Sequence, residues 1–566
     1  MKSVLYPLLF VLDVLRASSF PLFLISLSLT FLRPIDLFAP EWLDQRPMLW
    51  LLLLALAAGV LSALKRRQLA ARPTHFVLMF VFAAVISASV AVNGWVGGAL
   101  PAAVQFAIAA VVFPLAALNL TSIGRIRVTA IVMLVTMIAA ASISMYSYYT
   151  GYQWQTLVMQ QSREDVEGFA YKPDLSDTSA VVPAEENSGN WFYRIRGVAI
   201  LNDPNDFAQM LVAVFPFLLL LTGRNRLRTR YTGQGTALSN VVGVINSVLD
   251  RLPLAREMLM LPAAAVLFWA VYLTHSRGAV IAAAAAVFAM AQKRLGLVRS
   301  LILLVAVAVA ALAFNLGSAG GRELSMKEQS AADRTRSWSV ALVLLKTYPV
   351  LGVGYGNFTD HNDLNLTAHN SFALCFAELG FTGYFLWIAL LVICFIGVQR
   401  VLARADPGGP HYQMAWLIRA SFVGYMTSAW FLSRTFSPGM YFILGMCAAI
   451  ACCQANEAQA ARARAAGTDT PPNPRNPRTS GRRSRGDSVA VARAAATLVM
   501  APPQIAGRLA YVPPKRRQAA VAVHEAAAGP ETLRRPEVPS HWVLPTIVTM
   551  VFTILAVQLF VILSRG

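Results

Sequence analysis

The sequence predicts an all-α polytopic membrane protein, and three observations support this fold class. Of the 566 residues, 57% are hydrophobic and only 13% are charged, about half the charged share of a soluble domain. Apolar runs of nearly twenty residues recur from end to end, and each is long enough to cross the ~30 Å hydrocarbon core of a bilayer. The chain lacks the alternating ten-residue segments typical of an outer-membrane barrel.

We expect about 12–13 transmembrane helices. A membrane domain should cover residues 1–454, with large connecting loops at 148–205 and 317–369. A basic, largely disordered segment should follow at 455–541, and an additional C-terminal transmembrane helix at 542–566. The predicted spans cover residues 17–32, 47–64, 76–92, 97–120, 127–147, 206–222, 258–274, 278–292, 300–316, 371–398, 413–432, 438–454 and 542–563.

The charges of the loops orient these spans, because cytoplasmic loops carry an excess of Lys and Arg. The loop "KRRQLAARP" after the second span is basic and should face the cytoplasm. Alternation then places 455–541 inside, and that segment carries fourteen Lys or Arg against six acids. The acidic 148–205 loop and the 317–369 loop fall outside. The net charge of +20 is therefore largely a cytoplasmic surplus facing anionic membrane lipids.

The sequence argues against nucleic-acid binding and against disulfides or a zinc site among the cysteines. The basic residues lack interleaved aromatic residues, so no nucleic acid is expected as a ligand. The five cysteines all lie in apolar runs with no CxxC pair, so we expect neither disulfides nor a zinc site among them.

The first unusual outer cluster is "YRIRGVAILNDPNDFAQ", residues 193–209. Its Asn and Asp residues around Pro204 are typical of a turn and a helix N-cap. Arg194 and Arg196 precede that turn where the loop enters the membrane. Such cations often extend toward the interface as anchors, but their place beside a turn makes them binding candidates.

The second cluster is "THSRGAV", residues 274–280, between two apolar runs. The connection is only a few residues long, so Arg277 lies at or inside the membrane boundary. An arginine there is costly and is a functional candidate by default, although it can also serve as an interfacial anchor.

The third cluster, "DRTRSWSVALVLLKTYPVLGVGYGNF", spans residues 333–358. It predicts an amphipathic helix with Trp338, Leu342 and Leu345 on one face, followed by a glycine-rich turn. Arg334 and Arg336 stand at the start of this helix. A helix partly submerged in the interface would need no further function.

The fourth cluster begins at His369, where a polar loop gives way to an apolar helix. Asn370 or Ser371 is a natural N-cap, and Gly380 and Gly383 should permit close helix packing. His369 has no comparable structural explanation. An imidazole beside arginine-bearing segments is a candidate proton acceptor.

In sequence order, the four clusters resemble those of the O-antigen ligase and O-antigen polymerase superfamily of bacterial inner-membrane proteins. The resemblance covers about residues 190–400. The ligase motif reads His369, Asn370, nine residues, Gly380, two residues and Gly383. Three further elements match at Arg196, Gly197, Asn202, Pro204, Asn205 and Ala208, at Ser276, Arg277 and Gly278, and at Arg334, Trp338, Pro349, Gly352 and Gly354. The 455–541 segment and the last span depart from the family plan and are expected to leave this region unaffected.

The resemblance implies a GT-C-like glycosyltransferase in the bacterial inner (cytoplasmic) membrane with its active site facing the periplasm. The donor would be an undecaprenyl-diphosphate-linked glycan, and the acceptor a sugar hydroxyl of lipid A–core or of another glycan. His369 would be the catalytic base. Arg277, Arg334, Arg336 and Arg196 would bind the diphosphate, because arginine holds phosphate oxygens in a fork, and Asn370, Gly380 and Gly383 would support them. No cofactor and no metal is expected, since no outer carboxylate cluster suggests one.

Several alternatives stay open. A polymerase of the same superfamily would share this layout, and transfer to a protein or an exopolysaccharide is also compatible with it. A small-anion transporter would place polar residues near the midplane of several helices, where Arg419 is the main charge in a late span. A non-catalytic assembly partner would act through residues 455–541.

Overall fold

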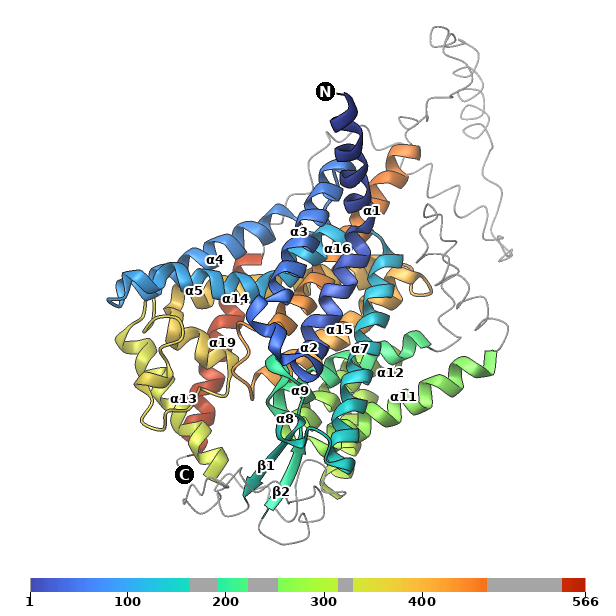
Figure 1. Cartoon of the computed structure of the whole chain (residues 1–566). Helices are drawn as coiled ribbons and strands as arrows, with labels where there is room; N and C mark the ends of the chain where they lie inside the picture. The colour runs from blue at the N-terminus through green and yellow to red at the C-terminus, as the bar shows by residue number, and fades with distance from the viewer. Residues whose placement is uncertain (1, 163–190, 222–252, 314–328, 466–541, 565–566) are drawn as a thin grey trace, which may run out of the picture. The chain divides into compact units, whose positions relative to one another are not determined.

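The computed structural model describes residues 2–162, 191–221, 253–313, 329–465 and 542–564 (Figure 1). The chain divides into two compact units, residues 1–457 with 541–566, and residues 458–540. Nearly all of the 455–541 segment and parts of the 148–205 and 317–369 loops lie outside the described residues. The predictions made for those parts stay predictions.

The helices and strands follow one another along the chain within these ranges. They are α1 (Lys2–Leu32), α2 (Pro34–Phe38), η1 (Pro40–Gln45), α3 (Pro47–Arg66), α4 (Pro73–Val92), η2 (Val96–Gly98), α5 (Ala99–Ala110), α6 (Val112–Asn119), α7 (Ile123–Thr150), α8 (Trp154–Leu157), β1 (Val158–Ser162), β2 (Trp191–Ile195), η5 (Ala199–Leu201), α9 (Pro204–Val214), η6 (Phe215–Leu221), α11 (Pro253–Leu273), α12 (Arg277–Ala313), α13 (Gln329–Thr347), η8 (Thr359–His361), α14 (Ser371–Arg404), α15 (Pro410–Ala429), α16 (Pro438–Ala465) and α19 (Val543–Leu563).

The predicted all-α polytopic membrane class is confirmed. Among the described residues, eight helices are long and apolar enough to cross a bilayer, and a pair bent by 43°, Val96–Ala110 with Val112–Asn119, would make nine. Three shorter apolar helices cover Met260–Leu273, Arg277–Gln292 and Leu295–Ala306. Each of the thirteen predicted spans lies on a helix where the structure describes it, but only these eight or nine meet the length and hydropathy of a span.

α15 covers the predicted span at residues 413–432. It does not meet the length and hydropathy of a membrane span, and it is not one of the three shorter apolar helices. It carries several polar residues, including Arg419, whose side chain is buried and donates to the Ala289 carbonyl of α12. α15 packs against α9, α12 and α14. A helix surrounded by protein can hold such a charge, because backbone carbonyls rather than lipid contact it.

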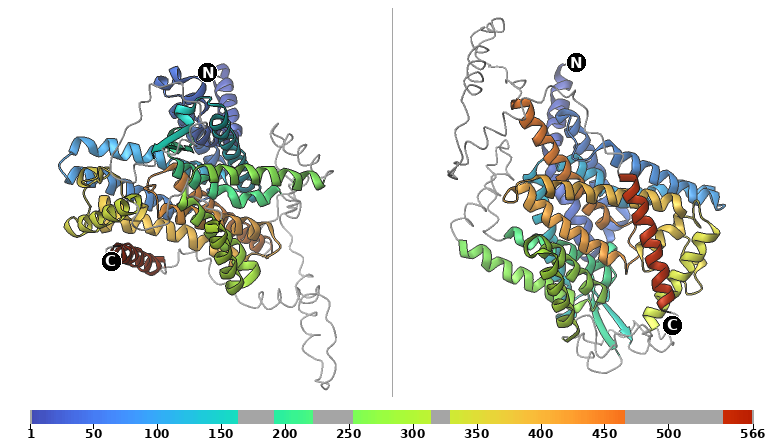
Figure 2. Two further views of the ribbon diagram at one scale, coloured as in Figure 1. Left: turned by 90° about the horizontal axis from the view of Figure 1, so that it is seen from below. Right: turned by 180° about the vertical axis from the view of Figure 1, so that it is seen from behind.

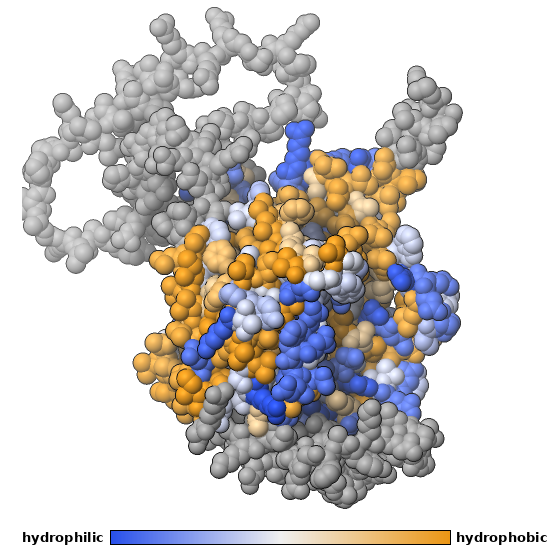
Figure 3. Space-filling model, turned by 90° about the vertical axis from the view of Figure 1, so that its left-hand side faces the viewer, coloured by the Kyte–Doolittle hydropathy of each residue, from blue (hydrophilic) through white to orange (hydrophobic). Residues whose placement is uncertain are grey.

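The membrane-facing surface of the first unit is apolar. Figure 3 shows one face on which hydrophobic residues cover much of the described surface and hydrophilic residues gather through its middle. Large side chains such as Phe80, Leu100 and Phe552 are 76%, 73% and 69% exposed. Contiguous apolar surface of this kind is covered by lipid in a membrane protein.

A two-stranded hairpin interrupts the helical pattern. β1 pairs antiparallel with β2, and Met159 lies opposite Arg194. The hairpin lies at the lower end of the unit in Figure 1, away from the start of α1. The sequence did not predict it, because a strand of five residues is too short to show a clear alternation. It matters for the site, because β2 carries Arg194 and leads directly to Arg196.

The last helix belongs to the frame of the membrane domain. α19 packs against α13 and α14, and Figure 2 shows it running beside both. The Phe560 and Trp338 ring centroids are 4.9 Å apart, and the Tyr384 hydroxyl is hydrogen-bonded to Thr553. The expectation that this span leaves the candidate region unaffected was therefore wrong, because α19 contacts α13 and α14, which both carry residues of that region.

Candidate functional site

The start of α9 forms one side of the candidate site. Asp203 caps the helix, accepting the backbone N–H groups of Asn205 at 2.7 Å and Asp206 at 3.4 Å. Pro204 occupies the first helical position, where its missing N–H costs nothing. The predicted turn and N-cap are confirmed. The cap leaves the Asp203 carboxylate at the mouth of the site.

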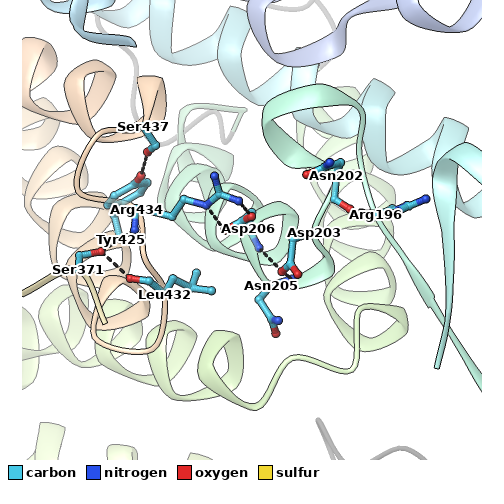
Figure 4. A network of polar contacts seen from close by, with 10 residues as sticks. All are labelled: Arg196, Asn202, Asp203, Asn205, Asp206, Ser371, Tyr425, Leu432, Arg434 and Ser437. Atoms are coloured by element: carbon cyan, nitrogen blue, oxygen red, sulfur yellow. Dashed lines mark hydrogen bonds and ion pairs between the residues drawn. The ribbon is translucent and has the colours of Figure 1, made fainter. Parts of the chain in front are cut away.

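Arg194 and Arg196 hold neighbouring segments of backbone. Arg194 Nε donates to the Thr274 carbonyl at 2.8 Å, which ties β2 to the turn before Arg277. Arg196 donates to the carbonyls of Thr156, Gln155 and Asn202 at 3.0, 2.7 and 3.3 Å. In Figure 4 its guanidinium points away from Arg434. The predicted diphosphate role of Arg196 stays a prediction, and this geometry gives Arg196 a structural task.

Arg277 is the first residue of α12. The Ser276 hydroxyl accepts the Ala279 N–H at 3.4 Å, so Ser276 acts as the helix cap. A Cβ placed on Gly278 would lie 3.2 Å from Phe431 Cβ. The α12 start therefore abuts the loop of residues 430–437 that joins α15 to α16.

The two arginines of α13 have different surroundings. Arg336 pairs with Asp363 at 3.2 Å, and both side chains are exposed, at 57% and 78%. Arg334 is partly buried and close enough to His369 to influence its protonation. Trp338 Nε1 donates to the Ala368 carbonyl at 2.8 Å and so fixes α13 against the residue before His369. Of the two α13 arginines, Arg334 is thus the one whose charge acts on the histidine.

His369 stands immediately before the helix cap. Asn370 Oδ1 accepts the N–H groups of Phe372 at 2.9 Å and Ala373 at 3.0 Å, which confirms Asn370 as the N-cap of α14. His369 itself has a φ of 47°, a left-handed conformation that is uncommon outside glycine but more frequent for histidine than for most other residues. Burial and the Arg334 cation lower the pKa of His369, while Asp203 opposes them. The imidazole is therefore neutral at neutral pH and can accept a proton.

The 430–437 loop is fastened to the start of α14. The Ser371 hydroxyl donates to the Leu432 carbonyl at 2.6 Å and accepts the Arg434 N–H at 2.8 Å, and the Thr435 hydroxyl donates to the Ser371 carbonyl at 2.7 Å. The Arg434 side chain forms an ion pair with Asp206 of α9 (Figure 4). These contacts join the start of α9 to that of α14 and add a cation to the site.

Arg434 was missed by sequence reasoning. It lies in "SRTFSPG", residues 433–439, a short polar connection between two apolar helices. The same signal drew attention to Arg277 in "THSRGAV". The position of Arg434 between two predicted outer ends of spans was enough to make it a candidate.

Gly380 interrupts α14, and the backbone of another segment of the chain packs against it. Its φ is 61°, and the Phe381 N–H donates to the Pro349 carbonyl at 2.7 Å. The Val353 N–H donates to the Ala377 carbonyl at 3.0 Å. A Cβ on Gly380 would lie 2.5 Å from the Val350 backbone. The expected helix-to-helix packing was wrong for Gly380, because its missing side chain admits the backbone of the 349–354 turn.

Two further residues lie at this break. A Cβ on Gly383 would come within 2.3 Å of Leu379 in its own helix, so its small size accommodates the bend. Glu378 is buried, and its carboxyl group faces the backbone N–H groups of Gly356 and Phe358. Glu378 was not singled out from the sequence. It anchors the glycine-rich turn that follows α13, and so helps to fix α13 against α14.

Only one group of side chains in the described part of the chain has the spacing of metal ligands. It consists of His411, Cys453 and Glu457. It includes none of the residues predicted for the outer site, and a metal-free reaction there stays a prediction.

Comparison with protein families gives one match. Residues 262–388 match the family model described as O-antigen ligase. This stretch contains Arg277, both arginines of α13, His369 and the glycines of the α14 break, whereas Arg196 and Arg434 lie outside it. A comparison with curated proteins gives no significant match.

Proposed function

The chain carries a domain of the O-antigen ligase family, and from this premise we propose that it transfers a glycan from an undecaprenyl-diphosphate-linked donor to a sugar hydroxyl of lipid A–core. The family match indicates a glycosyltransferase-type activity in a multi-pass membrane protein. The proposal adds the donor, the acceptor and the residues that act on them.

The observation that carries the proposal is the pairing of a neutral histidine with a neighbouring cation. His369 is held between α13 and the cap of α14, and Arg334 contributes to lowering its pKa. A proton acceptor for an acceptor hydroxyl and a cation for a phosphate group are therefore close enough to interact electrostatically. Gly278, which follows Arg277, lies against Phe431 of the 430–437 loop, and that loop is fastened to the start of α14; this supports a place for Arg277 in the same region.

In the proposed reaction, the acceptor hydroxyl oxygen attacks the anomeric carbon of the donor. The bond from that carbon to the diphosphate oxygen breaks with inversion, and undecaprenyl diphosphate leaves with the electron pair. His369 takes the hydroxyl proton, which later passes to solvent. Arg277 and Arg334 stabilise the negative charge that develops on the leaving diphosphate, as forked donors at a low-dielectric boundary can. No metal takes part in this scheme.

We place this reaction at the periplasmic face of the bacterial inner membrane. The charge distribution of the loops supports that orientation, because the 148–205 and 317–369 loops that flank the site are the ones expected outside. ATP is not available there, so the bond between the glycan and the lipid diphosphate must supply the free energy.

The acceptor distinguishes the ligase from its main alternative. A polymerase of the same superfamily would use the same His369 and arginines but extend a lipid-linked glycan. Purified full-length protein in nanodiscs, given a defined lipid-linked donor, can be offered either acceptor. Product on lipid A–core supports the ligase proposal. Product on the lipid-linked glycan alone would contradict it and indicate a polymerase.

The role of His369 is tested in the same assay. His369→Gln keeps hydrogen-bonding capacity but loses the base, and should transfer roughly 10²–10⁴-fold more slowly. His361→Gln is the matched control, because His361 is an exposed histidine of the same loop whose Nδ1 lies 2.9 Å from the Asn357 carbonyl oxygen, and it should retain donor binding and turnover. Wild-type turnover by correctly inserted His369→Gln would remove His369 from the chemistry.

A further inference from the structure

His411, Cys453 and Glu457 bring three metal-binding atoms within 4.8 Å of one another. Cys453 and Glu457 are four residues apart on α16, so they share one face of that helix. His411 is the second residue of α15. The chain reverses at residues 430–437, which returns the end of α16 to the start of α15. The cluster is therefore built by two helices and not by a loop.

The distances between the three side chains suit one tetrahedral ion. Cys453 Sγ is 3.7 Å from His411 Nε2 and 3.5 Å from Glu457 Oε1, and His411 Nε2 is 3.4 Å from Glu457 Oε2. A zinc ion with bonds of ~2.3 Å to sulfur and ~2.1 Å to nitrogen or oxygen would separate its ligand atoms by about 3.4–3.6 Å. These separations are close to that spacing, but the two Glu457 distances belong to its two different oxygens. With one atom from each residue, the three ligand atoms lie within 4.8 Å of one another, so the Glu457 carboxylate would move to place one oxygen on the ion.

The three residues of the cluster differ in their exposure to solvent. The exposed fractions are 3% for Cys453 and, for the side chains, 14% for His411 and 56% for Glu457. The backbone N–H of Ile123 is hydrogen-bonded to the Cys453 sulfur, and such outer contacts orient metal ligands. An ion could enter from the Glu457 side, where water could complete its coordination.

We propose that His411, Cys453 and Glu457 form a zinc site with a fourth position open to water. A sulfur, a nitrogen and an oxygen ligand together match zinc, whereas magnesium and calcium take oxygen ligands. Zinc would replace the proton of the Cys453 thiol, leaving a zinc-bound thiolate and one proton released to solvent. The prediction of no zinc site among the cysteines rested on cysteine spacing alone. It took no account of His411, which lies 42 residues before Cys453.

The site serves the fold and stands apart from glycan transfer. α15 has 20 residues, or about 30 Å of helix, and its other end leads into the loop that carries Arg434. Zinc would link the start of α15 to the end of α16 on the face predicted to be cytoplasmic. This inference does not depend on the proposed function.

The test measures zinc in full-length protein in nanodiscs, loaded with zinc and then dialysed against metal-free buffer. Elemental mass spectrometry should find about one zinc per chain in the wild type. Cys452→Ser is the matched control, since Cys452 is a buried neighbour on the same helix but no ligand, and should keep this content. Cys453→Ser, His411→Ala and Glu457→Gln should lose it.

Glu457→Gln separates loss of zinc from misfolding, because this side chain is exposed and its replacement should leave the fold intact. Cobalt offers a second readout on the wild type, with the absorption of tetrahedral cobalt bound to a thiolate, which Cys453→Ser should abolish. A wild type that retains no zinc, or equal zinc in the wild type and all three ligand variants, would overturn the proposal.

Discussion

Replacing Gly380 by alanine should undock the glycine-rich turn from α14. The residue has a φ of 61° and a ψ of −165°, a region that is essentially restricted to glycine and in which a side chain costs about 1–3 kcal/mol. Its Cβ would also lie 2.5 Å from the Val350 backbone and 2.6 Å from the Pro349 carbonyl oxygen. Because these are backbone atoms, no rotamer change can relieve the overlap, and the 349–354 turn must move.

The movement would disturb four backbone hydrogen bonds. They run from Phe381 to Pro349, Thr382 to Val350, Val353 to Ala377 and Gly354 to Glu378, at 2.7, 3.3, 3.0 and 3.0 Å. With each bond contributing about 0.5–1.5 kcal/mol, the loss together is roughly 2–6 kcal/mol. The turn also sets α13 against α14, so Arg334 should shift relative to His369 and glycan transfer should fall.

Gly151→Ala is the control for a glycine with positive φ at which an added side chain meets no neighbouring atom. Gly151 has a φ of 76° with no heavy atom within 4 Å of an added Cβ, so only the conformational cost of about 1–2 kcal/mol applies. Thermal unfolding in nanodiscs and the transfer rate would be measured for both variants. The reasoning fails if Gly380→Ala unfolds at the same temperature as Gly151→Ala and retains wild-type transfer.

Three further predictions follow from the candidate site. Transfer should decline only below the ordinary imidazole pKa of ~6.5, because burial and Arg334 lower the pKa of His369. Arg334→Gln should move this acid limb to higher pH, and a pH–rate profile at saturating donor with an unmoved limb would count against the electrostatic effect of Arg334 on His369. Arg277→Lys keeps the charge but loses the fork, and should cost roughly 10–100-fold in transfer at normal insertion, whereas a simple interfacial anchor would tolerate it. Chelators should leave the transfer rate of Glu457→Gln, which lacks the proposed zinc site, unchanged, and a loss restored by a divalent ion in that variant would contradict the metal-free scheme.

The sequence was informative wherever a structure depends on neighbours along the chain. The Asp203 cap before Pro204 and the Asn370 cap of α14 follow from local preferences. The buried face of α13 around Trp338 follows from helical periodicity. The apolar runs likewise gave the positions of the helices, because a bilayer-spanning helix leaves a long signal.

The sequence was uninformative where the partner is distant. The Asp206–Arg434 pair joins residues 228 apart, and Glu378 meets a turn that belongs to another element. Gly380 has the spacing of a helix-packing glycine, and only the position of the 349–354 backbone reveals its different use. The proposed zinc cluster likewise needs the second half of α16 folded back to the start of α15.

The helix α19 shows how such distant contacts reach the proposed base. Phe560 lies against Trp338, and Trp338 donates to the Ala368 carbonyl next to His369. The Tyr384 hydroxyl of α14 is bonded to Thr553 on the same helix. α19 therefore supports both α13, with its cation, and α14, with the histidine at its start. Since rigid support keeps a reacting pair in its productive geometry, this last helix forms part of the structure on which the proposed chemistry depends.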